Sequence, residues 1–413
     1  MCAREARGAA APGVGALYLH IPFCARKCAY CDFASRAARP GDPLVAAYVR
    51  ALEAQLEEAA SLGLLEGCET AYVGGGTPSL LGPSLLGGLV ERVVRTCAPG
   101  ELSSEANPDS LTDEVIDALR RAGATRLSVG VQSLDDAELA CLGRLHDAAS
   151  ARERVRAAVA SGLDVSVDLM CATPGQTDAS WARTLAGAVA LGVGHVSVYP
   201  LQIEEGTEFD RRYADDPCAF NDPDVQANRM TQAQAVLEGH GLARYEVASY
   251  ARPGRECRHN IAYWTGVPYL GLGTKASSML DVKLYLRLCG AVPGLPEPPA
   301  GTARVRLTVE SGARAIAGDP RLSALSLSTE FLGAREAAAE DLMLAMRMTR
   351  GAGPGLLGRA REAIPAERLE GALREAVDTG LAAWSAGRLV PTQRGWLLGN
   401  ELYGLMWDLA GTC

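Results

Sequence analysis

Long apolar runs and a surplus of positive charge are both missing from this 413-residue sequence. No apolar run reaches the roughly 18 residues that a membrane-spanning helix needs, so we expect no transmembrane segment. The opening residues, Met-Cys-Ala-Arg-Glu-Ala-Arg, lack the apolar core of a signal peptide, and residues 1–14 are predicted to be a disordered tail. The formal net charge of −9 gives no electrostatic support for nucleic-acid binding, and none is expected.

A regular cysteine framework is missing as well, although the chain contains 12 cysteines. Nine of them are scattered: Cys2, Cys68, Cys97, Cys141, Cys171, Cys218, Cys257, Cys289 and Cys413. This usage is typical of a cytoplasmic protein with reduced, mostly buried thiols, and we expect that location. Each scattered cysteine is interpreted as a small apolar side chain rather than a ligand.

The three remaining cysteines, Cys24, Cys28 and Cys31, form a C-x3-C-x2-C run just after a β-like segment. Soft thiolates select iron–sulfur clusters, zinc or Cu(I). A [4Fe–4S] cluster usually takes four cysteines, so three in one loop leave one iron open to a second molecule. The alternative is a zinc knuckle with His20 as fourth ligand, although zinc sites more often show paired C-x2-C groups. A disulfide is less favoured still in a reducing compartment.

Strand-like and helix-like segments alternate along the first half of the chain. The strand-like segments lie at 16–21, 70–73, 102–105, 126–131, 163–169 and 195–201. Helical segments follow them, including 113–122 with Thr112 as its N-cap. Repeated β–α units favour a parallel sheet with helical crossovers. Six units are too few for a closed eight-unit barrel, so residues 15–240 are predicted to form an α/β fold, an open, TIM-like partial (β/α)6 barrel.

Polar candidates stand at the carboxyl ends of these strands, where barrels place their sites. Gly74-Gly75-Gly76-Thr77-Pro78 follows the second strand, Glu105 ends the third, Gln132 follows the fourth, and Asp168 lies near the end of the fifth. Glycines let the backbone approach a ligand closely, although a glycine triplet alone also suits a tight turn. Asp168 lies in an apolar strand, where an unpaired acid is costly, so we expect it to have a partner.

The second half of the chain has a different pattern. Residues 241–330 are predicted to be an irregular extension with a Pro-rich loop at 291–300. In residues 331–413, helices precede two short strand-like pieces and a last helix near 393–406, an order that resembles a winged-helix α+β domain. Acids and arginines nearly balance there, so a packing or partner-docking role is favoured over DNA binding.

The cysteine run resembles the signature of the radical SAM superfamily, in which S-adenosylmethionine chelates the open iron. Six segments further resemble one branch, the oxygen-independent coproporphyrinogen III dehydrogenases and their relatives, the HemW-type heme chaperones. These segments are Tyr18–Phe33, Gly74–Leu81, Ser104–Pro108, Arg126–Ser133, Gly143–His146 and Val167–Gln176.

The resemblance implies that Cys24, Cys28 and Cys31 hold the cluster. It also implies that S-adenosylmethionine is surrounded by Tyr18, Tyr30, Gly75, Gly76, Thr77, Glu105, Gln132, Arg144 and Asp168. Arg144, considered without the resemblance, would more usually be a solvated arginine on a helix. A reductant such as flavodoxin or ferredoxin and a monomer–homodimer equilibrium are implied as well.

Two features separate the two branches. The dehydrogenases carry a further cysteine two residues after the third ligand, whereas this chain has Phe33 at that position. The dehydrogenases also carry a long N-terminal extension, whereas only 23 residues precede Cys24 here. Both differences favour the chaperone branch, which implies heme binding and delivery of heme to an acceptor protein. The alternative is an enzyme that decarboxylates coproporphyrinogen III oxidatively.

The segment His259-Asn260-Ile261-Ala262-Tyr263-Trp264 matches the H-N-x-x-Y-W motif of the heme-binding relatives. The match implies a heme site of His259, Asn260, Tyr263 and Trp264, because histidine is a standard axial ligand of heme iron and aromatic rings stack on the macrocycle. Taken alone, the motif more often marks a structural histidine beside two core aromatics. Cys257 could add a thiolate.

Two segments depart from the family pattern. Cys171-Ala172-Thr173 stand where relatives have an aromatic residue or histidine and then Gly-Leu, and Lys275 interrupts a glycine-rich loop. We expect the first departure to alter the wall of the pocket. The identity of the substrate is therefore open, and another radical SAM reaction, such as methyl transfer, is a further alternative. A zinc-binding structural protein is the last alternative.

Overall fold

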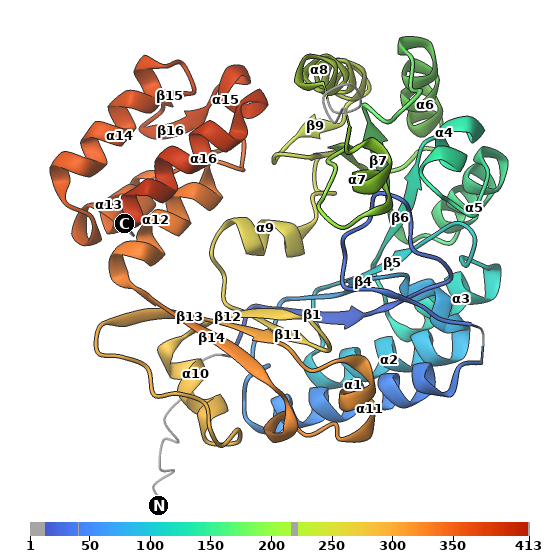
Figure 1. The fold of residues 1–413 in the computed structure, drawn as a ribbon, viewed down its shortest axis with the longest axis horizontal. Coiled ribbons are helices and arrows are strands. Elements are labelled where there is room, and N and C mark those ends of the chain that lie inside the picture. Colours follow the sequence, from blue (N-terminus) through green and yellow to red (C-terminus); the bar gives the residue numbers. More distant parts are fainter. Residues whose placement is uncertain (1–12, 40, 216–221, 412–413) are drawn as a thin grey trace, which may run out of the picture.

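The computed structural model describes residues 13–39, 41–215 and 222–411, and its centre is an open barrel of six parallel strands (Figure 1). The strands are β1 (Ala16–Ile21), β4 (Thr70–Gly75), β5 (Glu101–Ala106), β6 (Arg126–Gln132), β7 (Asp164–Cys171) and β8 (His195–Pro200). Each pairs in parallel with the next, from β1–β4 through β7–β8. The predicted partial barrel is confirmed, strand by strand.

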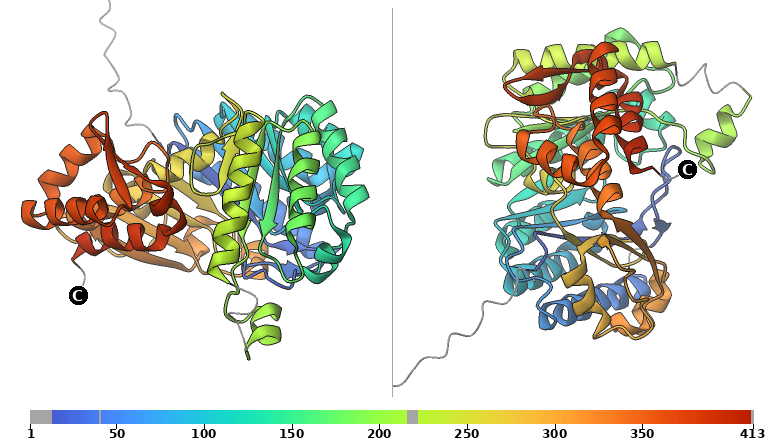
Figure 2. Two further views of the ribbon diagram at one scale, coloured as in Figure 1. Left: turned by 90° about the horizontal axis from the view of Figure 1, so that it is seen from above. Right: turned by 90° about the vertical axis from the view of Figure 1, so that its left-hand side faces the viewer.

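Helices cover the outside of these strands (Figure 1). They are α1 (Pro43–Ser61), α2 (Gly82–Cys97), α3 (Asp113–Ala122), α4 (Asp136–Cys141), α5 (Ala148–Ala160), α6 (Asp178–Ala190) and α8 (Pro223–Gly239), whereas the short α7 (Glu208–Tyr213) projects away from the barrel (Figure 2). Helix α3 illustrates why they form where they do. The Thr112 side chain accepts a hydrogen bond from the Val115 amide at its start, and Gly123 ends it in a left-handed conformation with φ of 98°. The predicted N-cap is confirmed.

The region expected to be irregular contributes strands instead. These are β9 (Ala243–Arg244), β10 (Ser249–Ala251), β11 (Tyr269–Leu272), β12 (Ser277–Asp281), β13 (Thr302–Val309) and β14 (Leu327–Gly333). They extend the barrel into one twelve-stranded sheet, ordered β14-β13-β12-β11-β1-β4-β5-β6-β7-β8-β10-β9. The prediction of an irregular extension is therefore wrong for these residues. Their pairing is non-local, since β11 lies parallel to β1, and a local pattern does not report it.

Three short helices lie among these strands, α9 (Arg258–Trp264), α10 (Val282–Cys289) and α11 (Ala313–Gly318). Residues 291–300 form a loop between α10 and β13, as predicted. The tail prediction is wrong for its last two residues, because Val14 is fully buried and the Gly13 amide donates to the Glu66 carbonyl. Residues 1–12 lie outside the described residues.

The C-terminal elements form a separate lobe at one end of the barrel (Figure 2). They are α12 (Ala334–Ala345), α13 (Pro354–Ala363), α14 (Ala366–Asp378), the hairpin β15 (Ala382–Ser385) and β16 (Arg388–Pro391), α15 (Gln393–Leu397) and α16 (Gly399–Trp407). This lobe has its own apolar core, distinct from that of the barrel. The small hairpin and helices near 335–348 and 366–379 were predicted, whereas α13 was not. The single last helix is instead two helices, which meet at Leu398 with ψ of 40°.

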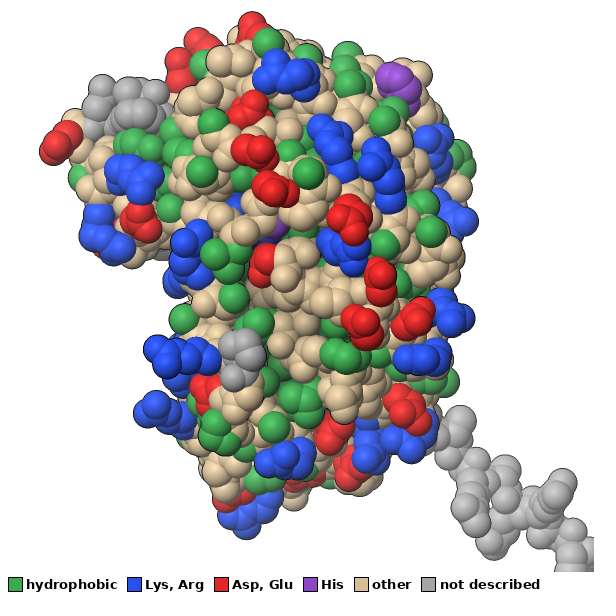
Figure 3. Space-filling view, turned by 90° about the vertical axis from the view of Figure 1, so that its right-hand side faces the viewer, with side chains coloured by type: hydrophobic (Ala, Val, Ile, Leu, Met, Phe, Trp, Pro, Cys, Tyr) green, Lys and Arg blue, Asp and Glu red, His purple; other side chains and the backbone are tan. Residues whose placement is uncertain are grey.

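Acidic and basic side chains are interspersed over the face shown in Figure 3. Among the described residues, no helix combines the length and the apolar character that crossing a bilayer requires. The scattered cysteines that are described are free thiols, buried at Cys68, Cys171 and Cys257 and half-buried elsewhere. Cys2, Cys218 and Cys413 lie outside the described residues.

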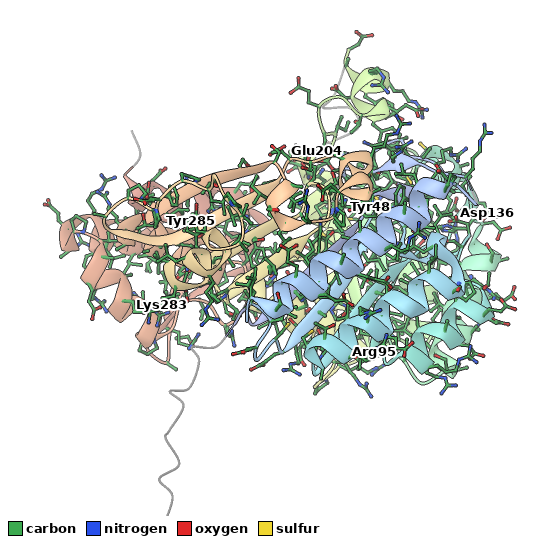
Figure 4. All side chains as sticks on the ribbon, turned by 90° about the horizontal axis from the view of Figure 1, so that it is seen from below. Tyr48, Arg95, Asp136, Glu204, Lys283 and Tyr285 are labelled. Carbon is green, nitrogen blue, oxygen red and sulfur yellow. The ribbon has the colours of Figure 1, made fainter. Side chains whose placement is uncertain are left out.

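Tyr48 connects the outer helices to the end of β1 (Figure 4). It is fully buried on α1, where its hydroxyl donates to the His20 carbonyl at 3.0 Å. The same oxygen accepts from the Thr274 amide at 2.9 Å. These two bonds position the end of β1, directly before the cysteine loop, against the loop between β11 and β12.

Candidate functional site

A cavity of about 320 Å³ opens at the carboxyl ends of the parallel strands. Its walls include nearly all of the residues expected around a cluster and S-adenosylmethionine. These are Cys24, Cys28, Tyr30, Cys31, Gly75, Gly76, Thr77, Glu105, Gln132, Arg144 and Asp168. Tyr18 is the exception, since it lines a neighbouring cavity of about 390 Å³ that shares Gly75 and Glu105. Segments far apart in the chain thus meet at one end of the barrel.

The three cysteines lie in a loop that is closed at its base. Strand β2 (Phe23–Cys24) pairs with β3 (Arg36–Ala37), and the Ala38 amide donates to the Cys24 carbonyl at 2.9 Å. All three thiols are free and half-buried. Burial raises the pKa of the Cys24 thiol and raises that of Cys31 to about 11. A positive centre is therefore needed to hold these sulfurs as thiolates at neutral pH.

Two polar side chains donate to these sulfurs. The Thr77 hydroxyl lies 3.5 Å from Sγ of Cys24, and Nη1 of Arg144 lies 3.4 Å from Sγ of Cys28. Such donors favour the thiolate form and tune a bound metal centre. Arg144 follows α4 in a loop and is half-buried, so the interpretation as a solvated helical arginine is wrong.

Asn107 connects these two donors and was missed from the sequence. Its Nδ2 donates to the Thr77 hydroxyl at 3.1 Å, and its Oδ1 accepts from Nη2 of Arg144 at 2.7 Å. The same nitrogen of Arg144 donates to the Gly130 carbonyl at 2.7 Å. The available signal was position, because Asn107 directly follows β5, at the end where the other candidates stand.

The glycine run brings the end of β4 against β1 and Glu105. Gly75 has φ of 112°, and a Cβ there would lie 2.5 Å from the His20 ring. Its amide donates to Oε2 of Glu105 at 2.9 Å, and the Gly76 amide donates to the Ile21 carbonyl at 2.7 Å. Only glycine suits this conformation and this approach, so the run is more than a generic turn.

Two acids in the cavity have perturbed pKa values. Burial raises the pKa of Glu105 to about 7, against the effect of the Gly75 amide, and raises that of Asp168 to about 6. Oε1 of Glu105 accepts from the Tyr72 hydroxyl, and Oδ2 of Asp168 accepts from the Ser128 hydroxyl, both at 3.0 Å. The expected partner of Asp168 is therefore a hydroxyl. The two acids favour a cationic ligand beside them.

The interior of the barrel below these acids is lined by small and polar side chains. Ser103, Ser128, Ser166 and Ser197 lie on four consecutive strands, β5 to β8. Closed barrels fill the same layers with bulky branched residues. Small residues here leave the cavity deep enough to reach His195, whose ring nitrogens bond to the hydroxyls of Ser166 at 2.7 Å and Tyr245 at 2.9 Å.

His20 does not face the thiols, which argues against the zinc knuckle. Its Nε2 bonds to the Ala34 carbonyl and its Nδ1 to the Tyr18 hydroxyl, both at 3.0 Å. The ring is buried and does not line the cavity of the cysteines. A fourth zinc ligand from His20 would need both bonds to break.

Comparison with known proteins decides the family. The family model of the radical SAM superfamily matches residues 18–186. The heme chaperone HemW of Mycobacterium tuberculosis is 37% identical over 94% of this chain and 93% of its own length. HemW of Bacillus subtilis is 30% identical over 94% of this chain and 97% of its own. This chain belongs to the HemW family of radical SAM proteins.

The fold of this HemW-family chain resembles a solved structure over most of its length. Coproporphyrinogen III oxidase (HemN) from Escherichia coli superposes with a TM-score of 0.75 over 96% of this chain and 91% of its own, at 21% identity. At this identity the likeness shows the fold alone. It includes the C-terminal lobe as well as the barrel.

Radical SAM membership implies a [4Fe–4S] cluster and S-adenosylmethionine, and the cavity residues fit both. Three thiols, two of them with a side-chain donor to the sulfur, suit an iron–sulfur cluster, and Glu105 and Asp168 suit a sulfonium cation. Among the described residues, no three ligating side chains already converge as they would around an ion. The thiols share a wall of the cavity, and ligation would draw them together.

The side chains of the HemW-type motif on α9 do not line one common cavity. His259 is 1% exposed, with Nδ1 bonded to the Thr70 hydroxyl and Nε2 to the Tyr263 hydroxyl, both at 3.0 Å. Asn260 lines the cavity of the cysteines, and Tyr263 lines the neighbouring one beside Tyr18. As placed here, His259 is a structural histidine, and burial lowers its pKa to about 3.

The rest of the motif region has separate surroundings. Trp264 faces the C-terminal lobe, where the Arg347 guanidinium lies 5.2 Å from its ring centre. Cys257 is buried, and its thiol lies 3.7 Å from Oε1 of Glu101. It lines the deep part of the cysteine cavity. Among the described residues, no heme site is therefore preformed around His259.

The two departures from the family pattern lie away from the cavity of the cysteines. Met170 lines it, but Cys171, Ala172 and Thr173 do not, so the expected change to its wall is wrong. The chain turns away there, with φ of 57° at Ala172. Lys275 pairs with Glu310 and lines the cavity that contains Tyr18.

Proposed function

We propose that this protein is a heme chaperone that binds a [4Fe–4S] cluster, S-adenosylmethionine and heme, and delivers heme to an acceptor protein. Cys24, Cys28 and Cys31 hold the cluster in this proposal. When bound, the cluster supplies the electron that cleaves the sulfonium of S-adenosylmethionine. The observation that carries the proposal is that free thiols and two half-buried acids line one cavity together.

The remaining expected residues bind the cofactor from the same walls. Glu105 and Asp168 attract the cation, and Thr77 and Arg144 support the sulfurs. Gln132 has φ of 65°, a conformation that is costly for a residue with a Cβ and concentrates at functional sites. Tyr18 and Tyr30 belong to the proposed set, with Tyr18 reaching it through Glu105 and Gly75 from the neighbouring cavity.

An external reductant is proposed to reach the cluster through the cysteine loop. Phe33 is 62% exposed beside Cys31, and Arg26 and Lys27 are exposed in the same loop. An acidic one-electron donor such as flavodoxin or ferredoxin matches the charge of these two side chains. Phe33 occupies the position where the dehydrogenase branch has a further cysteine, which favours the chaperone.

Heme is proposed to bind against α9. Ligation of its iron by His259 requires the ring to leave Thr70 or Tyr263, at the cost of hydrogen bonds worth about 1 kcal/mol each. Asn260, Tyr263 and Trp264 each line a cavity and need no such change.

The test is anaerobic reconstitution with iron, sulfide and heme quantified together. A brown protein that takes up heme and passes it to an apo-acceptor supports the proposal. Heme titration into His259→Ala then decides the axial ligand, because equal binding by both proteins removes His259 from that role. Formation of protoporphyrinogen from coproporphyrinogen III, with S-adenosylmethionine and a reductant, would overturn the chaperone in favour of the decarboxylating enzyme.

A further inference from the structure

We propose that a second cavity, between the barrel and the C-terminal lobe, binds a flat apolar ring system that carries a carboxylate, the chemistry of a tetrapyrrole such as heme. In this site the rings of Trp264 and Trp396 form walls, and Arg347 pairs with the carboxylate. The inference rests on the proposed function, because it gives the location and the contacts of the heme.

The cavity has the size and the composition of a ligand site. Its volume is about 420 Å³, within the range of about 300–1,000 Å³ for small-molecule pockets. Helix α9 lies between the C-terminal elements and the barrel strands (Figure 1), and it contributes Trp264. Helix α15 contributes Trp396, and α8 contributes Ala227 and Met230. The walls are mainly apolar, and few polar groups enter them.

Trp396 is held rigidly as one wall. It is buried, its indole Nε1 donates to the Val247 carbonyl at 2.8 Å, and the Arg244 guanidinium lies 4.1 Å from its ring centre. A preorganised aromatic wall lowers the entropic cost of binding a planar ring.

Arg347 is the unusual group in this cavity. Its guanidinium lies against the rings of Trp264 and Tyr403, 5.2 Å and 4.3 Å from their centres. Among the described residues the guanidinium has no hydrogen-bond or ion-pair partner, and Nε of Arg347 and Nε1 of Trp264 are both buried without a partner. Arg347 is half-buried, and a partly desolvated cation without a counter-charge favours an anionic ligand.

The acid that lines this cavity does not satisfy Arg347. Glu246 is buried, and its Oε2 accepts from the Ala248 amide at 3.2 Å. Burial raises the pKa of this carboxyl, which favours its neutral form. A ligand carboxylate is the complement that Arg347 lacks.

The two cavities meet. Tyr199 and Asn260 line both the cavity of the cysteines and this one. A ring bound between Trp264 and Trp396 would lie next to the S-adenosylmethionine site, separated from it by these two side chains. This placement accounts for the motif residues Asn260 and Trp264 without moving His259.

The experiment is heme titration into the reconstituted full-length protein, followed at the Soret band, with heme and heme dimethyl ester as probes. Arg347→Gln is expected to weaken heme binding about 10- to 100-fold, the effect of losing a charge-assisted pair, and to leave the ester nearly unchanged. Ala227→Trp, a half-buried position on α8 that lines the cavity, is expected to weaken both probes by filling the space.

Matched controls keep the result interpretable. Arg361→Gln removes the same charge from the exposed side of α13, and Ala235→Trp adds the same ring at an exposed position of α8, so both should bind like wild type. Unchanged heme affinity in Arg347→Gln and Ala227→Trp would overturn this site while heme binding by wild type stands. Equal weakening of heme and ester by Arg347→Gln would overturn the carboxylate pairing. Failure of the wild type to bind heme would instead overturn the proposed function, and this site with it.

Discussion

At the scale of single residues, burial rather than exposed charge sets the pKa values of the acids in the cavity. Glu105 and Asp168 have raised pKa values because their carboxyls lie in a cavity with few charge partners. A raised pKa near neutrality is typical of functional acids, since small changes of environment then change the charge. The affinity of this site for its ligand should therefore depend on pH.

The first prediction concerns Glu105. Its carboxylate forms as the pH rises through about 7, so affinity for the cationic S-adenosylmethionine should increase between about pH 6 and about pH 8. Glu105→Gln should lower the affinity about tenfold or more at the higher pH and flatten the profile. Anaerobic calorimetry on the reconstituted protein measures both. The exposed Glu69→Gln is the control, and a wild-type affinity independent of pH would contradict the assignment.

The second prediction concerns Gly75. Alanine there combines a positive φ with a Cβ placed 2.5 Å from His20, so we expect a loss of about 2 kcal/mol or more in the free energy of unfolding. Gly67→Ala is a matched control, because Gly67 has φ of 79° but nothing within 4 Å of its Cβ position. It should cost only about 1 kcal/mol. Urea unfolding compares the two, and equal losses would show that the close approach to His20 is unimportant.

At the scale of elements, α9 depends on an acid that belongs to β5. The carboxylate of Glu101, which is buried, accepts from the backbone amides of Arg258 and His259 at 3.1 and 3.0 Å. These amides have no partner within the helix, and a carboxylate at this end also interacts favourably with the helix dipole. A short helix that carries a binding motif is thereby anchored to the barrel.

The third prediction tests this anchor. Glu101→Ala should lower the free energy of unfolding by about 1–3 kcal/mol, because the buried His259 amide and the partly buried Arg258 amide lose their acceptor. Hydrogen exchange should become faster in 258–264 before it changes in the barrel strands. Glu69→Ala removes an exposed ion pair with Arg258 and should cost at most about 1 kcal/mol. Similar effects of the two substitutions would contradict the anchoring role.

At the scale of the whole molecule, two apolar cores are joined by polar contacts, among them the ion pairs of Arg304 on β13 with Glu340 and Asp341 on α12. The Thr349 amide donates to the Tyr245 carbonyl at 3.1 Å, and Trp396 donates to Val247. The proposed heme cavity lies along this junction, which is where ligand sites commonly occur. The cysteine loop lies on the barrel, so cluster binding and heme binding can be studied separately.

The fourth prediction concerns removal of the cluster. A group that binds only the folded state stabilises it, so reconstitution should raise the thermal midpoint by a few degrees and protect residues 24–37 from protease. The variant with Cys24, Cys28 and Cys31 all changed to Ala should show neither effect. Differential scanning calorimetry and limited proteolysis, with and without chelator, measure this. An equal shift in the triple variant would mean that iron binds elsewhere.

Local patterns were sufficient for the barrel. Apolar spacing located six strands, and Thr112 located the start of α3. Because the carboxyl ends of parallel strands share one edge, the positions of Glu105, Gln132 and Asp168 in the sequence already predicted that they would lie together. The C-x3-C-x2-C run predicted the radical SAM superfamily for a similar reason, since its spacing is a local property of one loop.

Long-range contacts decided the rest. Pairing of β11 with β1 extends the sheet, and no local pattern encodes a partner so distant in the chain. Tyr18 lines the neighbouring cavity because the side chains of β1 divide between the two faces of the sheet, and His259 is buried because Thr70 and Tyr263 meet its ring. The chain by itself determined which residues could bind a cluster, since ligand chemistry and strand ends are local. Only the tertiary structure decided which side chains share a cavity, because burial and hydrogen-bond partners come from segments that meet only on folding.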